Sequence, residues 1–285
     1  MSDAFTKKVW KLAHGRELIL GPEAILMGIL NVTPDSFSDG GQYLEVEKAC
    51  HKAVEMKQQG ATIIDIGGES TRPGAEPISA TLEQDRILPV IEKLVSDVDV
   101  ILSVDTYRAS TARYAIAAGA HIVNDVWGGQ KETDILKVAG EHSAGLCLMH
   151  TGREREKAQD VILDQRVFLN KSLSLAVEHG VKESQIVLDP GFGFAKDEDE
   201  CLRLLSRLEE LHDFEFPLML GTSRKRFIGS VTNRDAEERD VGTAATSVIG
   251  RMKGAAIFRV HNIPVNKDAL AIVDATIATN DDGKI

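Results

Sequence analysis

The 285-residue sequence contains little cysteine and no excess of basic charge, and each shortage excludes a class of protein. Its three cysteines, Cys50, Cys147 and Cys201, lie within apolar segments, which predicts reduced core residues and neither a disulfide scaffold nor a zinc motif. The formal net charge is -11, and no Lys/Arg cluster outweighs the surrounding acids. Nucleic acid, whose phosphates need a basic face, is therefore excluded as a general partner, and an anionic ligand must meet a local basic pocket.

Long apolar runs and nucleotide-binding glycine motifs are also missing. No stretch has the apolar length needed to span a bilayer, and the first residues are polar and charged, without the apolar core of a signal peptide. We therefore expect a cytoplasmic protein with no membrane partner. Neither a Walker motif nor a strand-linked GxGxxG occurs, which argues against binding of nucleoside triphosphates or NAD.

The sequence does contain short apolar runs, rich in β-branched residues, that alternate with longer segments of helical period. Continuous hydrophobicity is typical of strands that are buried on both faces of a parallel sheet. Eight such runs favour an α/β fold of the closed (β/α)8 type, a TIM barrel, over its main rival, an open doubly wound sheet. The predicted strands are residues 25–32, 62–66, 100–105, 121–126, 145–150, 186–189, 217–221 and 255–260.

The chain is long enough for one large core, and no linker or shift in composition divides it. We therefore expect a single domain over residues 1–285. Before the first run, residues 9–12 and 18–20 predict a hairpin that closes the amino-terminal mouth of the barrel. Apolar residues at helical spacing predict two helix faces, one with Leu202, Leu205, Leu208 and Leu211, the other with Val241, Ala244, Ala245, Val248, Ile249 and Met252.

Polar residues end nearly all of the predicted strands. The carboxyl ends of the strands of a barrel converge on one face, where barrel enzymes build their active sites. A polar residue after a strand also caps the next helix, so each one alone has a structural explanation, but their repetition favours a common site. The residues are Asn31, Asp65 with Glu69, Asp105, Asn124 with Asp125, His150, Asp189, residues 223–226, and Arg259 with His261.

Four of these residues have the chemistry of a heterocycle site. Asp105, Asn124 and Asp189 supply acceptors and an amide from three separate strands, which suits a planar, nitrogen-rich ring whose edge offers several N–H donors. Lys225 would satisfy acceptors of the same ring.

A second group is cationic. Arg72, Arg259 and His261 are suited to holding a phosphate or pyrophosphate, with arginine making two-pronged contacts. Ordinary surface charge is the alternative for these residues. It is weakest for Arg259, because this residue follows an apolar run and belongs at the barrel mouth.

Three segments with glycine follow predicted strands. NVTPDSFSDGG (31–41) and GGESTRPGA (67–75) predict shaped loops over the pocket, although a surface turn also explains the first. In DPGFGF (189–194), Phe192 and Phe194 offer an apolar wall to an aromatic co-substrate, whereas a structural β-turn alone explains DPG.

In this order along the chain, these blocks resemble the dihydropteroate synthase family of the folate pathway. The resemblance covers nearly the whole chain, from about Ile25 to the last helix. The matching blocks are MGILNVTPDSFSDGG from Met27, DIGGESTRPGA from Asp65, SVDT from Ser103, VNDV from Val123, LDPGFGF from Leu188, TSRKRFIG from Thr222 and FRVH from Phe258.

The resemblance implies a transferase that joins p-aminobenzoate to hydroxymethyl-dihydropterin pyrophosphate and releases pyrophosphate with the help of Mg²⁺. Pyrophosphate would leave first, because the pterin delocalises the resulting cation, and positioning would matter more than a general base. The family analogy also implies a homodimer through the later helices and competition by sulfonamides.

The resemblance also assigns roles by position. The implied catalytic residues are Asp105, Lys225, Arg259 and His261. The implied pterin ligands are Asp105, Asn124, Val126, Met149, Asp189, Gly221, Lys225 and Arg259. Pyrophosphate would be held by Asn31, Arg72, Arg259 and His261, with Asn31 also at the metal. The p-aminobenzoate site would comprise Phe37, Thr71, Pro73, Phe194, Lys225 and Arg226.

The chain departs from the family pattern in three places. The segment MHTGREREKAQ from Met149 lacks the MQG-like stretch that many members carry, which leaves its contribution open. Arg226 stands where some members have serine, and Asn262 where aspartate often follows RVH. We expect neither Arg226 nor Asn262 to abolish activity.

Two other functions share this pattern in part. A corrinoid-dependent methyltransferase of the pterin-binding class would have the barrel and the pterin pocket, but it needs neither the NVTPDSF loop nor the cationic site. A catalytically silent pterin-binding protein should have lost Asn31, Arg72, Lys225 or His261, and all four are present.

Overall fold

The computed structural model describes residues 3–33, 42–70 and 76–282. A hairpin of β1 (Lys8–Lys11) and β2 (Glu17–Leu20) precedes a barrel sheet in which each strand pairs in parallel with its neighbours. The barrel strands are β3 (Ile25–Asn31), β4 (Ile63–Gly67), β5 (Ile101–Asp105), β6 (Ile122–Asp125), β7 (Gly145–Met149), β8 (Ile186–Asp189), β9 (Met219–Leu220) and β10 (Ile257–Val260).

The eight-stranded sheet closes on itself. Its strand order is β8-β7-β6-β5-β4-β3-β10-β9, and a parallel bridge between Leu188 and Leu218 joins the two ends. An open doubly wound sheet would leave two free edges, so the predicted (β/α)8 barrel is confirmed. Strand β9 is shorter than the predicted 217–221. Pro217 has no N–H to donate to a neighbouring strand, although its carbonyl still accepts from Leu188 N at 3.0 Å.

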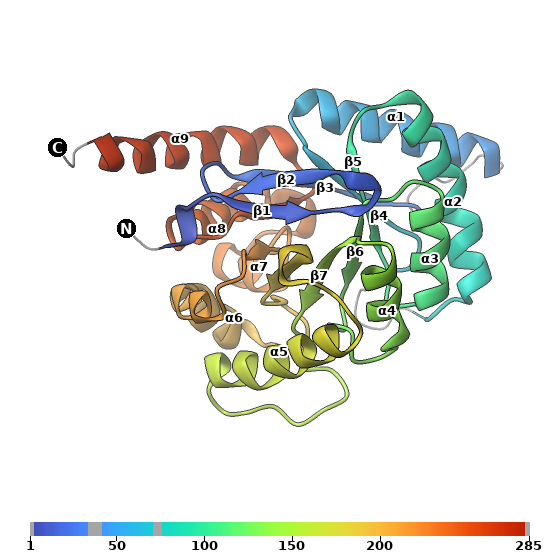
Figure 1. Ribbon diagram of the computed structural model, residues 1–285. Coiled ribbons are helices and arrows are strands. Elements are labelled where there is room, and N and C mark those ends of the chain that lie inside the picture. Colours follow the sequence, from blue (N-terminus) through green and yellow to red (C-terminus); the bar gives the residue numbers. More distant parts are fainter. Residues whose placement is uncertain (1–2, 34–41, 71–75, 283–285) are drawn as a thin grey trace.

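Helices cover the outside of the barrel (Figure 1). Between β9 and β10 the chain forms two helices in succession, one more than the simple repeat. The helices are α1 (Gln42–Gln59), α2 (Ala80–Asp97), α3 (Ala109–Ala117), α4 (Asp134–Glu141), α5 (Val161–Glu178), α6 (Glu198–Ser206), α7 (Arg226–Thr232), α8 (Asp240–Met252) and α9 (Ile263–Asp282). Within the described ranges, none of them is both long and apolar enough to cross a membrane.

The barrel interior begins with an apolar layer to which every strand contributes one side chain. Strand residues alternate between the inside and the outside of a barrel, so this layer fixes which later residues also point inward. Its members are Met27, Ile63, Ile101, Ile122, Cys147, Val187, Met219 and Ile257.

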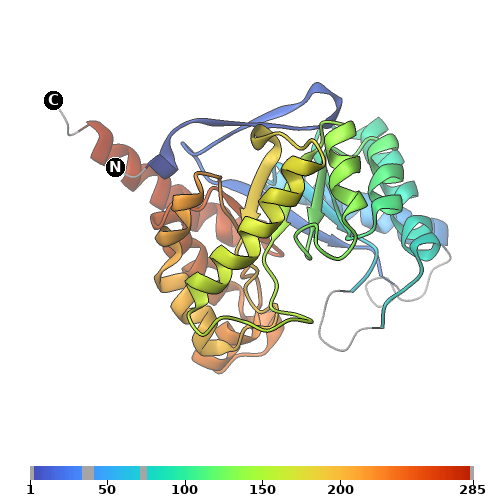
Figure 2. The same cartoon turned by 60° about the horizontal axis from the view of Figure 1, so that its bottom comes forward.

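The hairpin closes the amino-terminal end of this layer, as predicted (Figure 2). Trp10, Leu12 and Leu20 belong to the same buried cluster as the apolar layer. The Trp10 indole N–H donates to the Gln185 carbonyl at 2.6 Å, which satisfies its polar atom in a buried setting.

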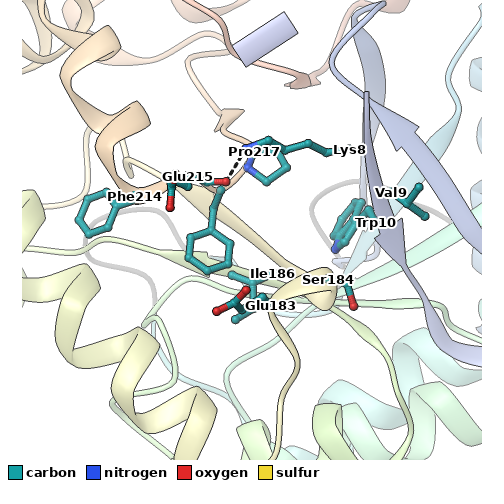
Figure 3. A pocket seen from close by; sticks show the side chains of 10 residues that line it. Lys8, Val9, Trp10, Glu183, Ser184, Ile186, Phe214, Glu215 and Pro217 are labelled. Atoms are coloured by element: carbon teal, nitrogen blue, oxygen red, sulfur yellow. Dashed lines mark hydrogen bonds between the residues drawn. The ribbon is translucent and has the colours of Figure 1, made fainter. Parts of the chain in front are cut away.

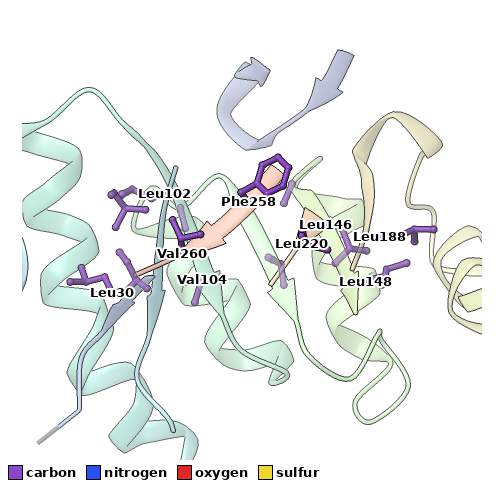
Figure 4. Packing of buried hydrophobic residues seen from close by; sticks show 14 of the residues in the cluster. Leu30, Leu102, Val104, Leu146, Leu148, Leu188, Leu220, Phe258 and Val260 are labelled. Atoms are coloured by element: carbon purple, nitrogen blue, oxygen red, sulfur yellow. The ribbon is translucent and has the colours of Figure 1, made fainter. Parts of the chain in front are cut away.

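Outward-facing strand residues pack against the helices. Figure 4 shows part of this outer cluster, including Leu102 and Val104 of β5 and Leu146 and Leu148 of β7, two strands that are separated by β6. Continuous hydrophobicity in the sequence therefore arises because these strands are buried on both faces.

The two predicted helix faces are only partly correct. Helix α6 ends at Ser206, and Leu208 and Leu211 are buried in a separate 3₁₀ helix, Leu208–Phe214. On α8, the buried side carries Thr243, Ser247 and Arg251. The predicted apolar residues Val241 and Met252 are instead exposed, at 78% and 66%. Apolar periodicity identified the helix but not the side that faces the barrel.

Candidate active site

Charged and amide side chains fill the barrel directly beyond its apolar layer. On four strands, the residue two positions after the apolar one is charged or an amide, so alternation points it into the barrel at the carboxyl end. These residues are Asp65 after Ile63, Asn124 after Ile122, Asp189 after Val187 and Arg259 after Ile257.

Arg259 links two carboxylates at the centre of this group. Its Nε donates to Asp65 Oδ2 at 2.6 Å, and its Nη2 donates to Asp105 Oδ2 at 2.7 Å. Burial opposes the charge of Arg259, but Asp65 and Asp105 outweigh it and raise the arginine pKa above its ordinary value. The guanidinium is therefore permanently charged and held by three strands.

The sequence indicates Asp65 only as a strand end, and the predicted site does not include it. It is fully buried, and its Oδ2 also accepts from Asn124 Nδ2 at 3.0 Å, so it fixes both Asn124 and Arg259. Its Oδ1 and the hydroxyl of Ser103 have no partner among the described residues. Buried polar atoms of this kind suit a polar ligand. The inward register of β4, two positions after Ile63, is the signal that would have found it.

Burial perturbs the pKa of Asp105. Burial, together with the neighbouring Asp65 carboxylate, raises this pKa to about 7, although Arg259 opposes the shift. Asp105 also lies close to Asn31, because a methyl group at Gly67 would stand 3.8 Å from both Asn31 Oδ1 and Asp105 Oδ2. The glycine leaves this space open between the three strand ends.

Asp189 and Lys225 occupy the other side of the site. Asp189 Oδ1 accepts from Gly191 N at 2.7 Å, and burial raises the pKa of this carboxyl. A methyl at Gly221 would lie 3.3 Å from Asp189 Oδ2, so this glycine keeps the carboxylate accessible. Lys225 Nζ donates to the Phe192 carbonyl at 2.8 Å, and burial lowers the lysine pKa to about 8, although Asp189 opposes the shift.

An apolar wall stands beside these charges. Val126, Met149 and Phe194 form one buried cluster with Trp127 packed against it. Lys225 Nζ lies 4.2 Å from the centre of the Phe194 ring. A flat aromatic ligand in this place would have hydrophobic contact on one side and polar groups at its edge.

His261 and Asn31 stand at the rim. The His261 backbone N–H donates to Ser223 Oγ at 3.1 Å, and Ser223 Oγ lies 2.9 Å from His261 Nδ1. If the hydroxyl donates to Nδ1, the neutral ring carries its proton on Nε2 as a donor. Asn31, the last residue of β3, is exposed, as is Arg226, the first residue of α7.

The other strand-end residues are used in structural contacts. Asp125 caps the following turn by accepting from the backbone N–H groups of Trp127 and Gly129. Glu69 pairs with Arg108, and His150 is fully buried against Asp164. These three residues have structural partners, but none of them caps the next helix, which is the alternative that the sequence offers.

Four predicted residues, Phe37, Thr71, Arg72 and Pro73, lie outside the described residues, so the structure does not place them. Within the described ranges, no three histidine, cysteine, aspartate or glutamate side chains form a metal cluster. The residues present still fit Mg²⁺, which binds through one or two protein oxygens, water and substrate phosphates. Asn31 Oδ1 is such an oxygen, and it is at the mouth of the site.

A separate pocket of ≈ 260 Å³ lies at the opposite end of the barrel (Figure 3). It is lined by Trp10 of the hairpin, Ile186 at the start of β8, and Pro217 before β9. These residues belong to the amino-terminal ends of the strands. The pocket therefore has no part in the charged site.

Comparison with known proteins shows the family of the chain. Residues 27–261 match the family model described as "Pterin binding enzyme". The chain is 47% identical over 255 residues to dihydropteroate synthase of Bacillus subtilis, covering 90% of this chain and 89% of that protein. It is 43% identical to the Clostridium beijerinckii enzyme of the same name, covering 92% and 97%.

Solved structures agree as well. Dihydropteroate synthase from Clostridium difficile, crystallised in the presence of pteroic acid, superposes with a TM-score of 0.88 at 43% identity, covering 90% of this chain and 98% of that one. The Xanthomonas albilineans enzyme with 4-aminobenzoic acid gives a TM-score of 0.89 at 37% identity, covering 95% and 99%. The chain therefore belongs to the pterin-binding enzymes and, within them, to the dihydropteroate synthase family.

Proposed function

We propose that the protein catalyses the condensation of hydroxymethyl-dihydropterin pyrophosphate with p-aminobenzoate, which forms dihydropteroate and pyrophosphate. The observation that carries the proposal is the Arg259 guanidinium held between Asp65 and Asp105, with Asn124 on the same carboxylate. The relatives' shared name supports this synthase over a methyltransferase or a silent pterin-binding protein.

The pterin ring is held by the strand-borne polar groups. Its edge N–H groups donate to Asp105, Asn124 and Asp189, while Lys225 donates to a ring acceptor. Val126, Met149 and Gly221 line the space, and Arg259 lies against the ring. Asp65 Oδ1 and Ser103 Oγ, which have no partner among the described residues, are available for further hydrogen bonds to the ring.

The first chemical step breaks the bond between the pterin methylene carbon and the pyrophosphate oxygen. The electron pair leaves with pyrophosphate, and the methylene cation is delocalised into the ring. Asp105 stabilises that cation electrostatically, while Arg259, His261 and Arg72 receive the anion. Mg²⁺ at Asn31 supplies further charge neutralisation when it is bound.

In the second step, the amine lone pair of p-aminobenzoate forms the new C–N bond, and the amine then releases a proton. An aromatic amine attacks as the neutral base, so no histidine-type general base is needed. Phe194, Lys225 and Arg226 would hold this substrate, together with Phe37, Thr71 and Pro73 of the loops outside the described residues.

We also propose a cytoplasmic homodimer in which each chain forms one domain. Exposed apolar side chains on neighbouring later helices support the dimer: Val231 on α7 is 65% exposed, and Val241 and Met252 on α8 more so. Packing of these side chains against a second copy of the chain would remove them from water. Sedimentation velocity would test it, since Val241→Glu should shift the protein to monomer.

The activity is tested by a coupled assay of pyrophosphate release. Release should require both the pterin substrate and p-aminobenzoate, and Lys225→Ala should nearly abolish it. A sulfonamide should raise the KM for p-aminobenzoate without changing the maximal rate. Pyrophosphate release that does not depend on p-aminobenzoate would contradict the proposal.

A further inference from the structure

The segment that departs from the family pattern is interlocked with the loop after β8. The His150 backbone N–H donates to the Asp189 carbonyl at 2.8 Å, and Gly152 N donates to the Phe194 carbonyl at 3.2 Å. Lys157 Nζ donates to the Ala195 carbonyl at 2.8 Å. Residues 150–157 are therefore bonded to residues 189–195 at several places.

The closest approach is at Gly191. Its φ is +65°, and a Cβ built there would lie 1.9 Å from the His150 carbonyl oxygen. Only glycine fits such a contact with this backbone conformation. The two segments are thus packed backbone against backbone, and a shift of one must move the other.

A buried charged network lies behind this contact. Lys196 Nζ donates to the Gly191 carbonyl at 2.9 Å and lies 2.7 Å from His150 Nδ1. His150 Nε2 lies 3.0 Å from Asp164 Oδ2, which also accepts from Arg155 Nη2 at 2.6 Å. His150, Asp164 and Lys196 are 0%, 3% and 8% exposed.

Burial and hydrogen bonds shift the pKa values of the His150 ring and the Asp164 carboxyl in this network. Burial and the nearby Lys196 lower the pKa of His150 to about 4, so its ring is neutral. Burial would raise the pKa of Asp164, but hydrogen bonds from His150 and Arg155 hold it below its usual range. Both ring nitrogens have partners: Nδ1 lies 2.7 Å from Lys196 Nζ, and Nε2 lies 3.0 Å from Asp164 Oδ2 and 2.9 Å from Arg155 Nη2.

The loop that this network supports carries two parts of the site. The Phe192 carbonyl accepts from Lys225 Nζ, and the Phe194 ring stands between Lys225 and Arg153. Arg153, whose guanidinium carbon is 4.7 Å from the ring centre, comes from the divergent segment itself. Lys225 and Phe194 both lie outside the strands, so their positions depend on contacts between loops.

We propose that Lys196, through the Gly191 carbonyl and the His150–Asp164–Arg155 network, is a positioning residue that sets the loop 190–196 and with it Lys225 and Phe194 for p-aminobenzoate. The inference rests on the proposed function for its substrate. It gives residues 150–157 a role, because their bonds to residues 189–195 hold the neighbouring loop from the side.

The test is Lys196→Met, which keeps the length of the side chain and removes its donors. The KM for p-aminobenzoate should rise about tenfold. Half-saturation by the pterin substrate should change less than about threefold, because most of its ligands are on strands. Hydrogen exchange of the amides in residues 190–196 should become faster.

Arg251→Met is the matched control. Arg251 is also a fully buried cation that donates to carbonyls, at 2.8 Å to Gly21 and 2.9 Å to Pro22, but these lie at the amino-terminal end. It should lower the melting temperature and leave both KM values and the exchange of residues 190–196 unchanged. An equal rise in the KM for p-aminobenzoate in the control would overturn the proposal, as would unchanged constants in folded Lys196→Met.

A second pair of variants covers the case in which Lys196→Met does not fold. His150→Phe removes the acceptor of Lys196 and should reproduce the rise in KM, whereas His150→Asn keeps an acceptor near Nδ1 and should restore most of the affinity. Equal KM values in these two variants would contradict the network. If the wild-type protein releases no pyrophosphate, the proposed function fails, and the exchange comparison still decides whether Lys196 positions the loop.

Discussion

The two ends of the barrel are built from the same strands with opposite chemistry. At the amino-terminal end, the inward positions are apolar on every strand, and the hairpin covers them with Trp10, Leu12 and Leu20. Two residues later, Asp65, Asn124, Asp189 and Arg259 face the same interior, and Asp105 joins them at the end of β5.

The difference shows how a barrel separates stability from chemistry. Apolar side chains at the amino-terminal end are close-packed and supply burial energy. The carboxyl end instead buries charged groups, which is unfavourable. Burial moves the pKa values of Asp105 and Lys225 to about 7 and about 8. A substitution on one strand should therefore affect activity or stability according to its position along that strand.

The largest effect is expected at the centre of the charged end. Arg259→Met removes the cation that links Asp65 and Asp105, so kcat/KM should fall about a thousandfold or more. Steady-state pyrophosphate release measures this, with circular dichroism to show that the variant is folded. Near wild-type turnover in a folded variant would remove Arg259 from the site.

Two residues earlier on the same strand, Ile257→Ala should lower stability and leave activity almost unchanged. Its fully buried side chain leaves a cavity, which should cost about 2–5 kcal/mol of unfolding free energy. Urea denaturation measures the loss, and kcat/KM at low temperature should stay within about twofold of wild type. A large loss of activity with unchanged stability would contradict the claim that the amino-terminal end serves stability and the carboxyl end serves activity.

The pH dependence sharpens the comparison within the charged end. Activity needs the Asp105 carboxylate and the Lys225 ammonium, so kcat/KM should fall as pH drops below about 7 and as it rises above about 8. Asp105→Asn should lower kcat by about tenfold to a hundredfold and abolish the acidic limb. A profile in which that limb persists would assign it to another group.

The smallest effect is expected at the hairpin. Trp10→Phe removes the indole N–H that donates to Gln185 and should cost about 1 kcal/mol of stability. Thermal unfolding measures it, and the kinetic constants should not change. A loss of activity here would show that the two ends are coupled.

Much of this organisation was predictable from the sequence. Continuous apolar runs predicted the strands, and polar residues at their ends predicted that Asp105, Asn124, Asp189, Lys225 and Arg259 would meet. Each of these patterns is local in the sequence. The side chains come close together because the closed barrel gathers the carboxyl ends of its strands at one face.

Other features depend on tertiary contacts that no local pattern contains. The inward register of Asp65 places it at the site, but no local pattern shows that its carboxylate holds both Arg259 and Asn124. The role of the segment after Met149 depends on packing against another loop, so the sequence alone does not predict it. On α8 an apolar stripe faces away from the barrel and a polar one faces it, so periodicity misled.

The account is tested most directly by binding of the pterin pyrophosphate to two variants of β8, measured by isothermal titration calorimetry. Asp189→Asn, at the charged end, should weaken binding about thirtyfold or more. Val187→Ala, two residues earlier in the apolar layer, should bind within about threefold of wild type. Equal weakening by the two variants, or wild-type binding by Asp189→Asn, would contradict the claim that the carboxyl end of the barrel is the pterin site.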